Sequence, residues 1–285
     1  MFRRRSAQPA NPRRLKAVLL DIDNTVILFD ESSFYNRYID LLAPVLADVF
    51  DRSEVGRRVM CATRSLEYGR QLHPVGRRFM DAFCEGLPDR RAEIETRFDR
   101  FYRERFTELR HLVTPVPLAY RTILAVRRHR LLLAVASNPV WPAAAQAMRL
   151  GWAGLGNLPF VHLTHSGNSR FTKPDPRYYR ALCDRLGVEA GQCLMVGNDP
   201  VNDGDATRIG MHTYLTTDSE KAGTANLVIS RAAQTRDALV VHTPDFRGPL
   251  VDLPAAVARL VGADRDPEPA RLTDPTPAPE PATVV

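Results

Sequence analysis

The chain has few of the residues that would make a stapled, zinc-binding or membrane-spanning protein. It has only four cysteines in 285 residues, at positions 61, 84, 183 and 193, and no two of them form a Cys-x-x-Cys pair. We therefore expect buried free thiols in a reducing compartment, without disulfides or a zinc site. No apolar run approaches the ~18 residues of a membrane helix, and the basic N-terminus lacks the apolar stretch of a secretory signal. These absences predict a cytoplasmic protein without a membrane partner.

Net charge is also low outside the two ends of the chain. The formal charge is +6, and five arginines in residues 1–14 supply most of it. We expect residues 1–14 to be a disordered basic arm and residues 264–285, rich in proline and acidic residues, to be a disordered tail. The remaining surface has an ordinary mixed charge, which argues against a nucleic-acid partner. The sequence does not indicate an oligomeric state.

Short, continuously apolar segments recur along the rest of the chain. The first, KAVLLD, ends at Asp21, and similar segments lie at 131–137, 160–165, 192–198 and 211–217. Such runs are typical of strands buried on both faces of a parallel sheet, and helical patterns lie between most of them. We predict a doubly wound, Rossmann-like α/β core over residues 15–31 and 113–263. A weaker edge strand at 238–242 and a last helix near 252–261 complete it.

Residues 32–112 interrupt this alternation of strand and helix. Apolar residues recur there at three- and four-residue spacing in four stretches, with charged residues on the opposite face. Pro44 is expected to bend or interrupt the first of these helices, and Pro74 and Pro88 separate others. We predict an α-helical bundle inserted after the first strand, with its aromatic residues packed inside as a core.

Polar side chains gather where the predicted strands end. They are Asp21, Asp23 and Thr25 after the first strand, Ser137 and Asn138 after the second, Lys173 on the loop after the third, and Asn198, Asp199 and Asp203 after the fourth. Ligands of open α/β sheets bind outside the carboxyl ends of the strands, so we expect these residues to share one site. Lys173 is one of only three lysines in a chain that otherwise uses arginine, which indicates a need for a compact ammonium group.

These segments together resemble the motifs of the haloacid dehalogenase (HAD) superfamily. The four stretches are DIDNT (21–25), ASNP (136–139), FTKPDP (171–176) and GNDPVND (197–203), in the order in which the family carries them. The helical insert resembles a C1-type cap of the phosphatase members. The fourth motif departs from the usual pattern, because Asn198 follows Gly197 and the first acid comes one position later.

The resemblance implies a Mg²⁺-dependent phosphatase that forms an aspartyl phosphate with a small phosphorylated metabolite. Asp21 would be the nucleophile and Asp23 the acid and base, since it can protonate the leaving alkoxide and later deprotonate the attacking water. Lys173 would offset the charge of the nucleophile and of a phosphoryl oxygen. Thr25, Ser137, Asn138 and Lys173 would bind the phosphate, with Thr25 also orienting Asp23. The implied metal ligands are Asp21, Asp23, Asp199 and Asp203, with Asn198 as an alternative to Asp199.

Other interpretations stay open at this point. Asp23, Asn24 and Thr25 also suit a simple polar turn or helix cap. A phosphomutase or phosphotransferase would use the same nucleophile and differ only in the acceptor that attacks the intermediate. A receiver-like signalling domain shares the acidic pair and the lysine but needs no helical insert, and a non-catalytic protein that binds a phosphorylated ligand would keep the same fold.

Overall fold

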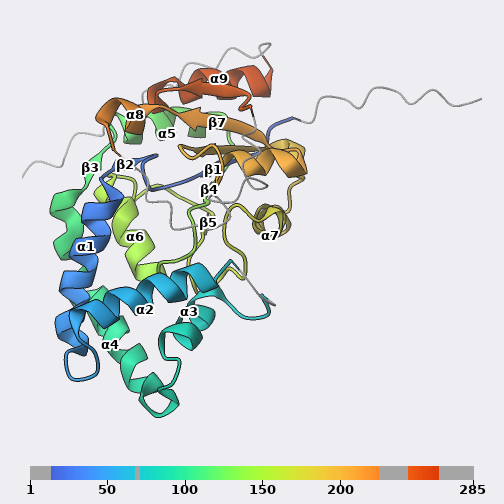
Figure 1. Ribbon diagram of the computed structural model, residues 1–285. Coiled ribbons are helices and arrows are strands. Elements are labelled where there is room, and N and C mark those ends of the chain that lie inside the picture. Colours follow the sequence, from blue (N-terminus) through green and yellow to red (C-terminus); the bar gives the residue numbers. More distant parts are fainter. Residues whose placement is uncertain (1–13, 68–70, 225–242, 263–285) are drawn as a thin grey trace, which may run out of the picture.

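The computed structural model describes residues 14–67, 71–224 and 243–262. Figure 1 shows an α/β core with a group of helices to one side of it. Within the described residues, none of the helices combines the length and the apolar character that crossing a bilayer requires. The predicted basic arm, apart from residue 14, and the predicted proline-rich tail lie outside the described residues.

The core is built on a parallel sheet with the strand order β5-β4-β1-β6-β7-β8. The strands are β1 (Ala17–Leu20), β4 (Leu132–Val135), β5 (His162–Leu163), β6 (Cys193–Gly197), β7 (His212–Thr216) and β8 (Phe246–Gly248). The chain leaves β1 for β4 on one side and later returns to β6 on the other, so the strand order reverses at β1. Ligands of doubly wound folds bind at such a reversal, outside the carboxyl ends of the strands.

Each central strand is buried on both faces, as its continuous apolar sequence predicts. On β1, Val18 and Leu20 pack into one hydrophobic cluster, and Ala17 and Leu19 pack into another on the opposite face. The first cluster includes residues of α5 (Ala119–Arg127), α6 (Ala143–Trp152) and α9 (Leu253–Val261). The second includes α7 (Pro176–Leu186) and the 3₁₀ turn Gly204–Ile209. The expected doubly wound architecture is confirmed.

The helical insert follows β1 and is entered through a two-stranded antiparallel ribbon. The ribbon pairs β2 (Ile27–Leu28) with β3 (Thr114–Pro115), so the chain enters and leaves the insert at the same place. The four helices are α1 (Glu31–Leu42), α2 (Arg52–Ser65), α3 (Val75–Phe83) and α4 (Arg91–Glu104). They lie together toward the lower left of Figure 1. A 3₁₀ turn, Ala43–Leu46, replaces the end of α1 at Pro44, as its missing N–H predicts. The aromatic residues of α1, α3 and α4 pack against one another and form the core of the insert.

The structure corrects one expectation and leaves another untested. Cys61 is exposed on α2, whereas Cys84, Cys183 and Cys193 are buried as expected, and all four are free thiols. The segment 238–242, where we expected an edge strand, lies outside the described residues. The described edge strand is β8, at 246–248, and α9 follows it. The short helix α8 (Asp218–Ala222) follows β7 in the chain.

Candidate active site

The DIDNT segment makes a tight polar turn at the carboxyl end of β1. The backbone N–H groups of Thr25, Val26 and Ile27 all donate to the carbonyl of Ile22. Asn24 has a left-handed backbone with φ of 51°, a conformation that asparagine tolerates better than most residues, and its side chain accepts a hydrogen bond from Phe29 N. Asn24 therefore has the turn role that its residue type suggested. The turn reverses the chain direction and leaves Asp21 and Thr25 at the edge of the sheet.

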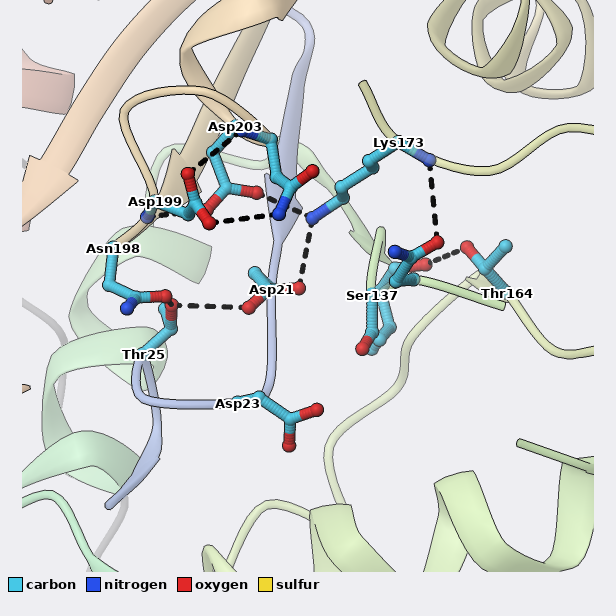
Figure 2. Close-up of polar contacts among 12 residues, drawn as sticks. Asp21, Asp23, Thr25, Ser137, Thr164, Lys173, Asn198, Asp199 and Asp203 are labelled. Carbon is cyan, nitrogen blue, oxygen red and sulfur yellow. Dashed lines mark hydrogen bonds and ion pairs between the residues drawn. The ribbon is translucent and has the colours of Figure 1, made fainter. Parts of the chain in front are cut away.

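Lys173 lies at the centre of the polar side chains. Its Nζ donates to Asp21 Oδ1 at 2.9 Å and to Asp203 Oδ1 at 2.5 Å, and Figure 2 shows it between these two carboxylates. The side chain of Lys173 is only 2% exposed. Asp175 caps α7 two residues later by accepting a hydrogen bond from Arg177 N, which fixes where this loop ends. The loop after β5 thus brings its lysine to the end of β1.

Burial and charge act against each other in this cluster. Burial raises the pKa of Asp21 to about 6; Lys173 opposes the rise and Asp203 adds to it. Burial alone would lower the pKa of Lys173, but Asp203 and Asp21 more than offset it, so this pKa is well above its ordinary value. Burial, followed by the charge of Asp203, also raises the pKa of Asp199. Negative charge is in excess around a single buried ammonium group.

The GNDPVND segment forms a turn whose side chains mostly bind its own backbone. Asp199 Oδ1 accepts from Val201 N at 2.8 Å and from Asn202 N at 2.9 Å, and Asp203 Oδ2 accepts from Asp199 N at 3.0 Å. A Cβ atom at Gly197 would overlap the carboxylate of Asp203, so glycine is required for this close approach. Asp203 faces Lys173, whereas Asp199 chiefly shapes the loop.

Thr25 and the serine–asparagine pair occupy the two flanks of Asp21. The Thr25 hydroxyl donates to Asp21 Oδ2 and to Asn198 Oδ1, each at 3.3 Å. We expected this hydroxyl to orient Asp23, but it lies against Asp21 instead. Ser137 is buried at the end of β4, and Asn138 Oδ1 accepts from Lys173 N at 3.3 Å. The structure therefore brings the four predicted segments of polar residues to one edge of the sheet.

Asp23 stands apart from the network around Lys173, as Figure 2 shows. Its carboxylate forms an ion pair with Arg149 of α6, a residue that the motif analysis missed. Arg149 and Gln146 are both fully buried and lie three residues apart on the apolar face of α6. An arginine on the buried face of a helix is rarely tolerated without a partner, and this was the available signal in the sequence.

The carboxyl edge has the donor chemistry that Mg²⁺ prefers. Asp21 and Asp203 present buried carboxylate oxygens; burial, with a further contribution from the charge of Asp203, raises the pKa of Asp21, and a bound cation would favour its ionised form. Mg²⁺ commonly uses only one or two protein carboxylates and completes its shell with water and substrate oxygens. Within 14–67, 71–224 and 243–262, no cluster of three or more histidine, cysteine or acidic side chains is arranged to hold a metal ion.

The protein thus combines an open parallel α/β core, a helical insert after the first strand and a buried lysine between two aspartates at the carboxyl end of the sheet. A family model described as haloacid dehalogenase-like hydrolase matches residues 15–208, which is more than half of the chain. The chain belongs to this hydrolase family, and the resemblance seen in its motifs is confirmed.

Individual relatives agree with the family and fold. A phosphoglycolate phosphatase of Rhodospirillum rubrum is 40% identical over 100 residues, which are 35% of this chain and 39% of that protein. The match therefore spans well under half of the curated relative. A 2-haloacid dehalogenase from Pseudomonas syringae pv. tomato aligns with a TM-score of 0.56 at 22% identity, covering 86% of this chain and 99% of the other. A HAD phosphatase from Thermococcus onnurineus aligns with a TM-score of 0.50 at 21% identity, covering 85% and 98%. These two structures share the fold.

Proposed function

We propose that this hydrolase is a Mg²⁺-dependent phosphatase that uses Asp21 as a nucleophile toward a small phosphorylated metabolite. The observation that carries the proposal is the placement of Lys173 Nζ against both Asp21 and Asp203 at the carboxyl end of β1. A carboxylate attacks an anionic phosphate only when nearby positive charge offsets the repulsion. The sequence similarity to a phosphoglycolate phosphatase supports a phosphate ester as substrate.

The reaction proceeds in two steps on this chain's own residues. An oxygen of Asp21 attacks phosphorus and forms an aspartyl phosphate, while the ester oxygen leaves and takes a proton from Asp23. Water then attacks the same phosphorus, Asp23 accepts its proton, and the bond to Asp21 breaks to release inorganic phosphate. Lys173 and the Ser137–Asn138 loop stabilise the charge on the phosphoryl oxygens. The Asn138 side chain holds this loop against Lys173 by accepting a hydrogen bond from the Lys173 backbone N–H.

Asp21 and Asp203 are the residues that we assign to Mg²⁺, with Asp199 or Asn198 at the edge of the same site. When bound, the cation would offset the negative charge of the phosphoryl group and of the carboxylates. Among the four predicted metal ligands, Asp23 is the one we favour least, because its carboxylate is ion-paired with Arg149.

The second aspartate favours phosphatase over dehalogenase activity. An acid that protonates a leaving alkoxide is needed for phosphate esters, whereas a departing halide needs no proton. In family terms, dehalogenase members lack this aspartate. Asp23 therefore separates the two activities represented among the structural relatives.

The test is the release of inorganic phosphate from a panel of phosphorylated metabolites and one aryl phosphate, with and without Mg²⁺. A 2-chlorocarboxylic acid is included with a chloride assay. We expect Mg²⁺-dependent phosphate release that is lost in Asp21→Asn and retained in Asp184→Asn, a matched change at an exposed position of α7. Chloride release, or phosphate release that survives in Asp21→Asn, would overturn the proposal. Transfer of the phosphate to an added alcohol would identify a phosphotransferase instead.

A further inference from the structure

Arg149 is a fully buried cation whose ion-pair partner is the acid of the proposed reaction. Its side chain is 0% exposed, and the Asp23 side chain that it pairs with is 26% exposed. Within the part of the chain that the structure describes, Asp23 is the only acidic side chain at ion-pair distance from Arg149. Arginine is almost never fully buried unless it is paired, because removing its charge from water is costly. The fold therefore accepts this cost beside one residue of the active site.

The two oxygens of the Asp23 carboxylate have different surroundings. Oδ1 contacts Arg149 Nη2 and is buried, without an aligned hydrogen bond to any of the described residues. Since Oδ1 is buried, Oδ2 is the carboxylate oxygen left for the exposed part of the side chain. The ion pair thus holds one oxygen of Asp23 and leaves the other toward the site.

Neighbouring side chains hold the guanidinium of Arg149 in place. Nη1 donates to Gln146 Oε1 at 2.6 Å, three residues earlier on α6. Gln146 Nε2 in turn donates to the backbone carbonyl of Asn138 at 3.4 Å. On another side, Cζ of Arg149 lies 5.5 Å from the centroid of the Trp141 ring, and both Gln146 and Trp141 are buried. Arg149 is therefore tied to the loop that follows β4, away from bulk water.

We propose that Arg149 is a positioning residue that holds Asp23 by Oδ1 and so makes Oδ2 the oxygen that exchanges protons during the reaction. In the first step, Oδ2 gives its proton to the ester oxygen as the bond from that oxygen to phosphorus breaks. In the second step, Oδ2 takes a proton from the water that attacks phosphorus. Proton transfer needs hydrogen-bond distance and alignment, so an acid that is fixed at one oxygen transfers its proton better than one that turns freely. The inference rests on the proposed phosphatase function and adds the residue that orients its acid.

The experiment compares two aryl phosphates whose leaving groups differ in their need for a proton. The 4-nitrophenolate ion is a weak base that leaves readily without a proton, whereas unsubstituted phenolate is a stronger base that leaves slowly unless an acid protonates it. The readout is the ratio of kcat/KM for 4-nitrophenyl phosphate to kcat/KM for phenyl phosphate, at one pH and one Mg²⁺ concentration. This ratio reports the steps up to the loss of the phenol, and it does not depend on the fraction of correctly folded enzyme.

The ratio is measured for the wild type, Asp23→Asn, Arg149→Met and the double variant Asp23→Asn/Arg149→Met. We expect Asp23→Asn to raise the ratio by about tenfold or more, because it removes the acid. Arg149→Met should raise the ratio by about tenfold, because a misplaced acid loses much of its effect. The double variant should have the same ratio as Asp23→Asn, since Arg149 acts only through Asp23.

Two further variants guard against an effect on folding or on overall charge. Arg149→Gln, which keeps a polar group without the charge, tests the same expectation if Arg149→Met does not fold. Arg180→Met removes an exposed arginine from α7 and should have the ratio of the wild type.

Three results would overturn the inference while leaving the phosphatase proposal intact. An unchanged ratio in Arg149→Met and Arg149→Gln, with equal losses toward both substrates, would show that Arg149 only stabilises the fold. An unchanged ratio in Asp23→Asn would show that Asp23 is not the acid that Arg149 orients. A ratio in the double variant well above that of Asp23→Asn would show that Arg149 acts by another route. Absence of phosphate release from both aryl phosphates by the wild type, or release that survives in Asp21→Asn, would instead count against the phosphatase proposal itself.

Discussion

Replacing Lys173 with methionine is the change that the geometry of the site makes most informative. The ammonium group contacts Asp21 and Asp203 at 2.9 and 2.5 Å, and these side chains are 9% and 5% exposed. Methionine fills much of the same space without the charge, so the two buried carboxylates would lose their shared cation. Breaking a buried ion pair by removing one partner costs about 3–5 kcal/mol. This is a large part of the ~5–15 kcal/mol that stabilises an ordinary folded protein.

The cost should depend on pH with a definite sign. Lys173 holds the pKa of Asp21 down, so its removal raises this pKa further above the value of the unfolded chain. A carboxyl group with a raised pKa in the folded state binds its proton more tightly there, so stability falls as pH rises from about 4 through the raised pKa. The deficit of Lys173→Met relative to the wild type should therefore be largest above pH 7 and smaller at pH 5.

The assay is urea unfolding at pH 5 and pH 7.5 without added metal, followed by tryptophan fluorescence and far-ultraviolet circular dichroism. Lys221→Met, a change at an exposed lysine of α8, is the control and should alter the free energy of unfolding by less than about 0.5 kcal/mol. The double variant Lys173→Met/Asp203→Asn should recover part of the loss, because it removes one of the unpaired charges. A loss below about 1 kcal/mol at pH 7.5, or an equal loss at both pH values, would refute the reasoning.

Three further predictions concern catalysis and the insert. The acid limb of kcat/KM against pH should have its inflection at or below about pH 6, because in the proposed mechanism Asp21 attacks in its ionised form and burial raises its pKa to about 6. More Mg²⁺ should move the inflection to lower pH, and a move to higher pH would contradict this. Gly197→Ala should lower kcat by about a hundredfold, since its Cβ would displace the Asp203 carboxylate, while Gly151→Ala, whose Cβ meets nothing within 4 Å, should leave kcat unchanged. Phe83→Ala should lower the free energy of unfolding by about 3–5 kcal/mol in the same urea assay, because Phe83 is fully buried in the core of the insert; a loss under 1 kcal/mol would mean that the insert is loosely packed.

The placement of the main elements could be predicted from local sequence alone. A parallel strand that is buried on both faces has to be continuously apolar, so KAVLLD and the similar segments were visible without any knowledge of their partners. The four helices of the insert were visible for a related reason, since each needs one apolar face to pack against its neighbours. The short strands were not predicted. The ribbon pairs only two residues of β2 with two of β3, and the edge strand β8 is three residues long, so each carries too little sequence pattern.

The sequence predicted which residues lie in the candidate site, but not which of them contact one another. Polar residues directly after buried strands point to the carboxyl edge of a parallel sheet, which is why Asp21, Ser137, Lys173 and Asp203 were expected together. The sequence did not show that Lys173 contacts both Asp21 and Asp203, that Thr25 lies against Asp21, or that Asp199 mainly shapes its own turn.

Local sequence was enough to predict the main strands of the core, the helical insert and the set of polar groups at the sheet edge, because periodicity and strand-end position are properties of neighbouring residues. Only the tertiary structure decided which of those groups share charges, because that depends on loops from distant parts of the chain arriving at the same point. Asp23 shows the difference most clearly: its motif is local, yet its partner Arg149 is brought to it from α6 by the packing of the core.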